Sequence, residues 1–97
     1  MNAAAIRVEL RIRDVRSLKE KRRTVKSVTS DMVRTFGVSV AEVDHQDLWQ
    51  RATLGVAVVA AQPAHLDRIV HSIEKAFRER TDVEMLASAV EFMERPE

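Results

Sequence analysis

The chain has 97 residues, enough for one hydrophobic core, so we expect a single domain over residues 1–97. Apolar residues make up 45% of the chain and charged residues 32%, a balance that is typical of soluble globular proteins and excludes a disordered or fibrous chain. The formal net charge is only +1, from 16 Lys and Arg against 15 Asp and Glu, which argues against a strongly basic nucleic-acid binder.

The composition also limits the chemistry and the location that we expect. No cysteine is present, which excludes disulfides, thiolate metal sites and a cysteine nucleophile. The apolar runs are too short for a secretory signal or for the roughly 20 residues of a membrane-spanning helix. We therefore expect a cytoplasmic protein that does not enter membranes.

The first third of the chain predicts a strand followed by a helix. Apolar and charged side chains alternate over residues 6–12, and this period of two indicates a strand with one buried face. The sequence Ser-Leu-Lys-Glu at residues 17–20 matches a capping box, in which the serine hydroxyl and the glutamate carboxylate each accept a hydrogen bond from a free backbone N–H. We expect a helix from there to about Phe36, with Gly37 ending it in a left-handed conformation.

The rest of the chain predicts two strands, a helix and a last strand. β-Branched residues at strand spacing predict strands over residues 38–43 and 51–61, joined by a polar connection. Pro63 suits the first turn of a helix that carries one apolar stripe. A fourth strand is expected over residues 83–93, with a bulge because its alternation is imperfect, and residues 94–97 are expected to fray.

The order β-α-β-β-α-β predicts an α+β domain with a ferredoxin-like fold. Right-handed crossovers would give a four-stranded antiparallel sheet of strand order 4-1-3-2, with both helices on one face. The end of the first strand, the start of the first helix and the connection between the second and third strands would then lie at the same edge of the sheet. Residues 13–26 and 44–51 should therefore be neighbours in space.

The other face of this sheet would be left open. Its first strand would present four charged side chains there, and its third strand small or apolar ones. These are Arg7, Glu9, Arg11 and Arg13 on the first strand, and Thr53, Gly55, Ala57 and Val59 on the third. Two interpretations stay open: a sheet that faces solvent, or a homodimer formed through this face.

The charge is unevenly distributed along the chain. Residues 7–34 contain ten basic and four acidic side chains, a net charge of +6, so the remainder carries −5. A basic segment of this kind is either a solvated face or a surface that contacts the phosphates of a nucleic acid. The candidate phosphate contacts are Arg13, Arg16, Lys19, Lys21, Arg22, Arg23 and Lys26, with Trp49 and Arg51 as candidate base contacts.

Lys21 and Arg22 differ from the other basic residues, because they point toward the apolar side of their helix. There they could meet the connection that carries Asp44, His45 and Asp47. Either these groups form a structural ion-pair network or they form a ligand site. No second histidine lies at ligand spacing, and glycine-rich phosphate loops and nucleophile motifs are absent, so we predict no metal site, no cofactor and no catalytic residue.

Two segments of this sequence resemble the YlxP-like family of small bacterial proteins. They are RSLKEKRR at residues 16–23 and VSVAEVDHQDLWQRATLG at residues 38–55. The resemblance covers nearly the whole chain, although after Gln62 only the general pattern matches. It implies a ferredoxin-like fold and a bacterial cytoplasmic protein that is often encoded among genes for translation initiation and ribosome maturation. The family is a domain of unknown function, so it implies no catalytic residues.

The charge distribution and this resemblance together predict a non-enzymatic factor that binds ribosomal RNA or the ribosome through the basic surface of the first helix. The alternative is a protein-interaction or homodimerisation module that uses the open face of the sheet. The two hypotheses differ in the part of the molecule that would contact the partner.

Overall fold

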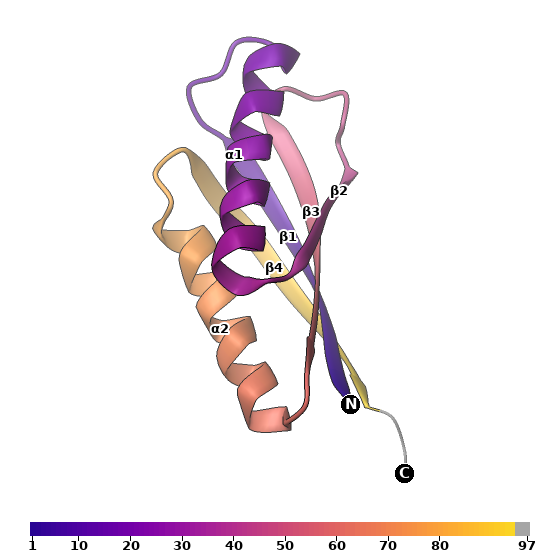
Figure 1. Ribbon diagram of the computed structural model, residues 1–97. Coiled ribbons are helices and arrows are strands. Elements are labelled where there is room, and N and C mark those ends of the chain that lie inside the picture. Colours follow the sequence, from indigo (N-terminus) through magenta and orange to yellow (C-terminus); the bar gives the residue numbers. More distant parts are fainter. Residues whose placement is uncertain (95–97) are drawn as a thin grey trace.

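Six elements follow one another in a computed structural model that describes residues 1–94 (Figure 1). They are β1 (Asn2–Ile12), α1 (Leu18–Phe36), β2 (Ser39–Asp44), β3 (Arg51–Ala60), α2 (Pro63–Glu79) and β4 (Val83–Glu94). The predicted order is confirmed, and β1 begins four residues before the expected start. Residues 94–97 are expected to fray, and of these, residues 95–97 lie outside the described part of the chain.

The strands form one antiparallel sheet in the order β2-β3-β1-β4, and both helices lie on the same side of it (Figure 1). This is the predicted ferredoxin-like α+β fold. β1 is an inner strand of the sheet: it pairs with β3 along one edge and with β4 along the other. Within residues 1–94, neither helix combines the length and the apolar character needed to cross a lipid bilayer.

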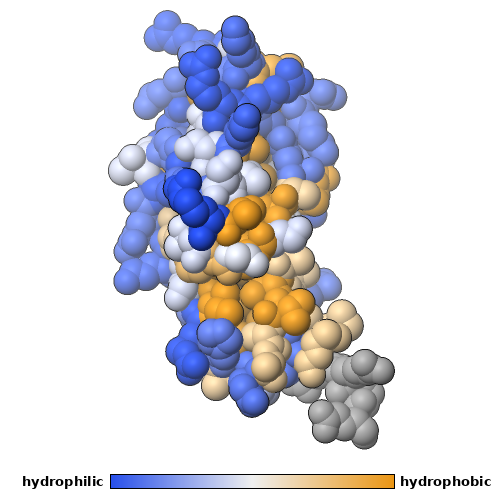
Figure 2. Space-filling view, in the orientation of Figure 1, coloured by the Kyte–Doolittle hydropathy of each residue, from blue (hydrophilic) through white to orange (hydrophobic). Residues whose placement is uncertain are grey.

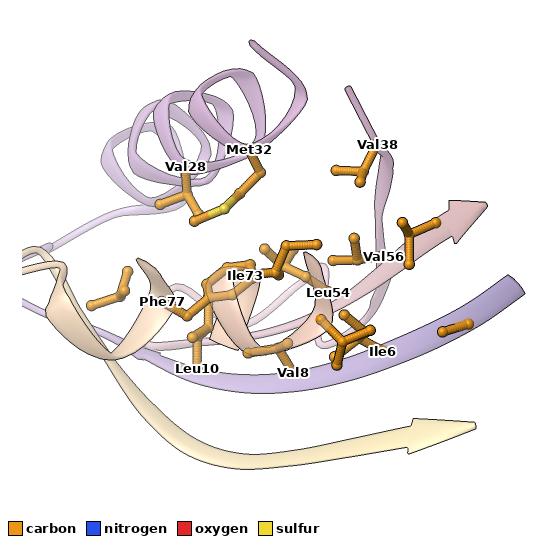
Figure 3. Close-up of a cluster of buried hydrophobic side chains, with 14 of the residues drawn as sticks. Ile6, Val8, Leu10, Val28, Met32, Val38, Leu54, Val56, Ile73 and Phe77 are labelled. Atoms are coloured by element: carbon orange, nitrogen blue, oxygen red, sulfur yellow. The ribbon is translucent and has the colours of Figure 1, made fainter. Parts of the chain in front are cut away.

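The core lies between the sheet and the two helices. Every second side chain of β1 is buried, including Ile6, Val8 and Leu10, as the alternation predicts. Figure 3 shows side chains of α1 and α2, among them Val28 and Phe77, on the helical side of the same cluster. Burying one such side chain stabilises the fold by about 1.5–3 kcal/mol relative to leaving it exposed.

The ends of α1 are fixed by the residues that predicted them. The Ser17 hydroxyl accepts a hydrogen bond from the Glu20 N–H at 3.1 Å. The Glu20 carboxylate accepts one from the N–H of Arg16 at 2.8 Å, so it reaches one residue beyond the cap. Gly37 ends the helix with φ 65° and donates its N–H to the carbonyl of Val33. The start of α1, which carries most of the candidate phosphate contacts, is thus well defined.

Two bulges interrupt the sheet. One lies in β4, where Leu86 has no partner between the pairs Glu9–Ala87 and Leu10–Met85, and it confirms the bulge predicted for this strand. The other lies in β2 at Val43, opposite β3. A Cβ atom on Gly55 would lie 3.1 Å from Cγ1 of Val43, so the glycine makes room for the bulged side chain.

Candidate nucleic-acid interface

The loop between β1 and α1 and the connection between β2 and β3 meet at one end of the molecule. The N–H of Ile12 donates to the carbonyl of Gln50 at 2.8 Å, and the N–H of Arg13 donates to the carbonyl of Asp82 at 3.0 Å. The first bond extends the sheet into the β2–β3 connection, and the second joins the loop after β1 to the segment before β4. The predicted proximity of residues 13–26 and 44–51 is confirmed by Lys21, whose Nζ donates to the carbonyls of His45 and Gln46.

Lys21 is the contact that holds α1 to the β2–β3 connection. Its side chain is 0% exposed, and its Nζ donates to Glu42 Oε2 at 2.6 Å, to the His45 carbonyl at 2.8 Å and to the Gln46 carbonyl at 3.4 Å. All three N–H groups of the ammonium therefore have acceptors inside the protein. Removing one partner of a buried ion pair costs about 3–5 kcal/mol, so this contact defines the position of the connection.

The prediction for Lys21 as a phosphate contact is therefore wrong, because the buried ammonium has no access to a ligand. Of the two interpretations left open, the structural ion-pair network is the one that is present, but its carboxylate is Glu42 and not Asp44 or Asp47. The sequence held a signal for this. Val38, Val40 and Glu42 share one face of β2 by alternation, which places the Glu42 carboxylate on the side of the sheet that α1 covers.

Asp44 and His45 shape the turn that follows β2. Asp44 Oδ1 accepts a hydrogen bond from the N–H of His45 at 2.8 Å, and His45 has a left-handed backbone with φ 63°. This is the ordinary role of an aspartate in a turn. Residues 1–94 contain no group of three histidine, aspartate or glutamate side chains placed to hold a metal ion.

The other basic residues of this region form an exposed cluster, which we call the basic surface. Its members are Arg13, Arg16, Lys19, Arg22, Arg23 and Lys26, all of them exposed. The expectation that Arg22 lies with Lys21 against the β2–β3 connection is wrong, because Arg22 is exposed and, among the described residues, takes no part in the ion pair of Lys21. Within the described residues, none of the six side chains lies within 4.0 Å of a carboxylate, in contrast to Arg34 and Arg80. Figure 2 shows hydrophilic side chains gathered at the end of the molecule where α1 begins. The structure therefore brings together six of the seven predicted phosphate contacts.

Trp49 lies in the β2–β3 connection, and Arg51 follows it at the start of β3. Trp49 is 37% exposed and therefore keeps part of its ring accessible. Arg51 begins β3, pairs with Arg11 of β1 in the sheet register, and has a side chain that is 42% exposed. Both residues stay candidates for contacts with a base or a phosphate.

The open face of the sheet has a charged end, which consists of Arg7, Glu9, Arg11, Arg51 and Glu84. Glu9 accepts hydrogen bonds from Thr53 Oγ1 at 2.8 Å and from Arg7 Nε at 3.1 Å. Arg11 pairs with Glu84 at 2.6 Å. Arg7 and Arg11 are thus compensated by the carboxylates of Glu9 and Glu84, respectively. These pairs were not predicted from the sequence. The pairing of Arg11 with Glu84 follows from the register of β1 and β4, which the bulge shifts.

The opposite end of the open face, which we call the apolar end, carries Ala3, Ala5, Ala57, Val59 and Met93, together with the exposed Glu91, which pairs with Ala5 in the sheet register. Val59 is 65% exposed and Met93 62% exposed. A hollow of about 300 Å³ lies among these strands. Val59 and Met93 flank Ala3 on β3 and β4, respectively. The open face therefore changes from charged to apolar along the length of β1.

Comparison with known proteins gives a family. Residues 3–90 match the family described as "Protein of unknown function (DUF503)". The chain is also similar to the uncharacterized protein YlxP of Bacillus subtilis (strain 168), with 37% identity over 57 residues, which are 59% of this chain and 62% of that protein. The match thus spans less than two thirds of the relative, and neither description names an activity, a ligand or a partner. Because the family match extends over most of its length, the chain belongs to the DUF503 family, in agreement with the YlxP-like resemblance of residues 16–23 and 38–55.

Proposed function

We propose that this protein is a non-enzymatic cytoplasmic factor that binds ribosomal RNA, free or within the ribosome, through the basic surface. One observation carries the proposal: six exposed basic side chains lie at one end of the molecule without a carboxylate partner among the described residues, although the net charge of the chain is only +1. Charges that are not compensated within a protein are available to an anionic partner.

The RNA would be recognised through its backbone and its shape. The open face of the sheet presents no aromatic side chain on β1 or β3, so it cannot stack bases as an RNA-recognition motif does. Lysines and arginines along α1 instead contact phosphates and release bound counterions. Trp49, which is partly exposed in the β2–β3 connection, would supply one ring on which an unpaired base can stack.

The experiment is a salt series that compares two triple variants of equal charge. Fluorescence anisotropy with labelled ribosomal RNA fragments would be recorded for the wild type, for Lys19→Ala/Arg23→Ala/Lys26→Ala on α1, and for Arg68→Ala/Lys75→Ala/Arg78→Ala on α2. The slope of log K against log salt should decrease in magnitude by roughly 2–3 for the α1 variant, because each phosphate contact contributes about 0.7–0.9. The α2 variant should stay close to the wild type.

Two results would contradict this proposal. One is the absence of binding by the wild type at low salt. The other is an equal loss of slope in both triple variants, because binding would then depend on total charge and not on the basic surface.

A second candidate function is supported by the apolar end of the open face. More than half of the surface of Val59 and of Met93 is accessible there, and monomeric proteins rarely leave such side chains clustered. This end would pair with its counterpart on a second copy of the chain, since a two-fold axis places the same patch on both subunits. Sedimentation velocity over a wide concentration range tests this function, and a strict monomer at every concentration would overturn it.

A further inference from the structure

A cavity of about 560 Å³ lies between the end of β1 and the start of β3. Residues 11–15, Gln50 and Arg51 line it. Its walls are fixed by the bonds from the Ile12 N–H to the Gln50 carbonyl and from the Arg13 N–H to the Asp82 carbonyl. The cavity is therefore built by backbone pairing and is present before any ligand arrives.

Three arginines and one aspartate are among the residues that line this cavity, namely Arg11, Arg13, Arg51 and Asp14. Arg11 is paired with Glu84 at 2.6 Å, which lies outside the lining. The side chain of Arg13 makes no ion pair or hydrogen bond with the residues that the structure describes. The lining thus holds more positive charge than its own carboxylate compensates.

Arg51 is the most poorly satisfied of these groups. Its terminal nitrogen lies 3.8 Å from Glu9, beyond hydrogen-bond distance, and this carboxylate already accepts from Thr53 and Arg7. Its Nε is buried and has no acceptor within the described part of the chain. A buried donor without a partner destabilises a fold. The Arg51 side chain as a whole is 42% exposed, so an anion in the cavity would be met by its terminal nitrogens and would supply the compensating charge.

We propose that this cavity binds one phosphoryl group, held by the guanidinium groups of Arg13 and Arg51 with Arg11 behind them. A guanidinium is planar and donates two parallel hydrogen bonds, a geometry that matches phosphate oxygens. Arg13 belongs both to the cavity and to the basic surface, so a nucleic-acid backbone that follows α1 reaches the cavity without a gap. The assignment of the phosphate to RNA rests on the proposed function, whereas the anion site itself does not.

The site is tested first with inorganic phosphate alone. Chemical shifts of the arginine Nε–H groups would be followed by NMR in ¹⁵N-labelled protein during a phosphate titration at low salt. The signals of Arg13 and Arg51 should shift with a common saturation curve, and those of Arg68 and Arg78 on α2 should not. Equal shifts at all four arginines would overturn the site, because they would show an ionic-strength effect.

Two conservative variants should change the affinity for phosphate in opposite directions. Arg51→Lys retains the charge but removes the planar fork, and it should weaken phosphate binding about tenfold or more. Asp14→Asn removes the one carboxylate of the lining, and it should strengthen phosphate binding several-fold. Asp14 has a left-handed backbone with φ 56°, a conformation that asparagine also adopts, so this variant should fold normally. An unchanged affinity in both variants would overturn the proposal.

The same variants identify the source of the phosphate. If the phosphoryl group in the cavity belongs to RNA, Arg51→Lys should weaken RNA binding about tenfold, and inorganic phosphate should compete with RNA for the protein. RNA binding that is unaffected by Arg51→Lys would overturn the assignment to RNA while the proposed function stands. If phosphate binds here but the wild type does not bind RNA at all, the anion site is supported and the proposed function fails.

Discussion

The two ends of the open face of the sheet differ in whether their side chains have partners within the protein. At the charged end, Glu9 accepts hydrogen bonds from Thr53 and Arg7, and Arg11 pairs with Glu84, whereas the side chain of Arg51 has no hydrogen-bond partner among the described residues. At the apolar end, Val59 and Met93 remain exposed. The same strands form both ends, so the difference arises from side chains alone. One face of the sheet therefore combines an ionic surface with a largely apolar one.

The largest effect is expected at Lys21, which ties α1 to β2 and to the β2–β3 connection. Lys21→Met removes the ammonium donor from Glu42 and from the carbonyls of His45 and Gln46, and it should lower the free energy of unfolding by about 3–5 kcal/mol. The double variant Lys21→Met/Glu42→Leu should lose less, because no uncompensated charge stays buried. Urea denaturation measures both changes. A loss below about 1 kcal/mol in the single variant would show that the ion pair contributes little.

A smaller effect is expected at the start of α1, which supports the basic surface. Ser17→Ala removes the hydroxyl that accepts the Glu20 N–H, and it should lower the free energy of unfolding by about 1 kcal/mol. Ser30→Ala, at an exposed position in the middle of the same helix, is the matched control and should change stability only slightly. Equal effects of the two variants in thermal denaturation would contradict the role of the cap.

An acid-dependent effect is expected from Arg80, which joins α1 to the segment before β4. Hydrogen bonds from its guanidinium hold the pKa of Asp31 and the pKa of Asp82 below their usual value of 3.8. Because both folded-state pKa values are lowered, the stabilisation is complete above about pH 4 and is lost as the pH falls through the lowered values. The difference in stability between the wild type and Arg80→Met should therefore be constant from pH 5 to 7 and shrink toward pH 2. A difference that grows on acidification would contradict this sign.

The smallest effect on folding is expected at the apolar end. Val59→Asp should change the free energy of unfolding by less than about 0.5 kcal/mol, because the side chain is 65% exposed. If the open face forms a homodimer, the same variant should abolish self-association in sedimentation experiments. Thr35→Asp adds the same charge on α1 and should leave the association unchanged.

The sequence predicted the topology because each element carried a local signal. Alternation indicated the strands, Ser17 and Gly37 indicated the ends of α1, and the irregular pattern after Val83 indicated a bulge. The partner of Lys21 was not predicted, since it depends on which face of β2 lies under α1. Likewise, the compensation of Arg11 by Glu84 depends on a register that the bulge shifts. Local pattern therefore located the basic residues but did not show that Lys21 and Arg11 are paired within the protein, whereas the members of the basic surface are unpaired within residues 1–94.

The cap of α1 has a consequence for the way in which an anion can be bound. A helix start ordinarily offers free N–H groups and a partial positive charge to a phosphate. Here the Glu20 carboxylate lies at that position and accepts the N–H of Arg16, while the Ser17 hydroxyl accepts the N–H of Glu20. The helix start thus carries a negative charge of its own, which opposes the binding of a phosphate there. We therefore expect a phosphate at this end of the molecule to be held mainly by long side chains, which can adapt to backbones of different shape.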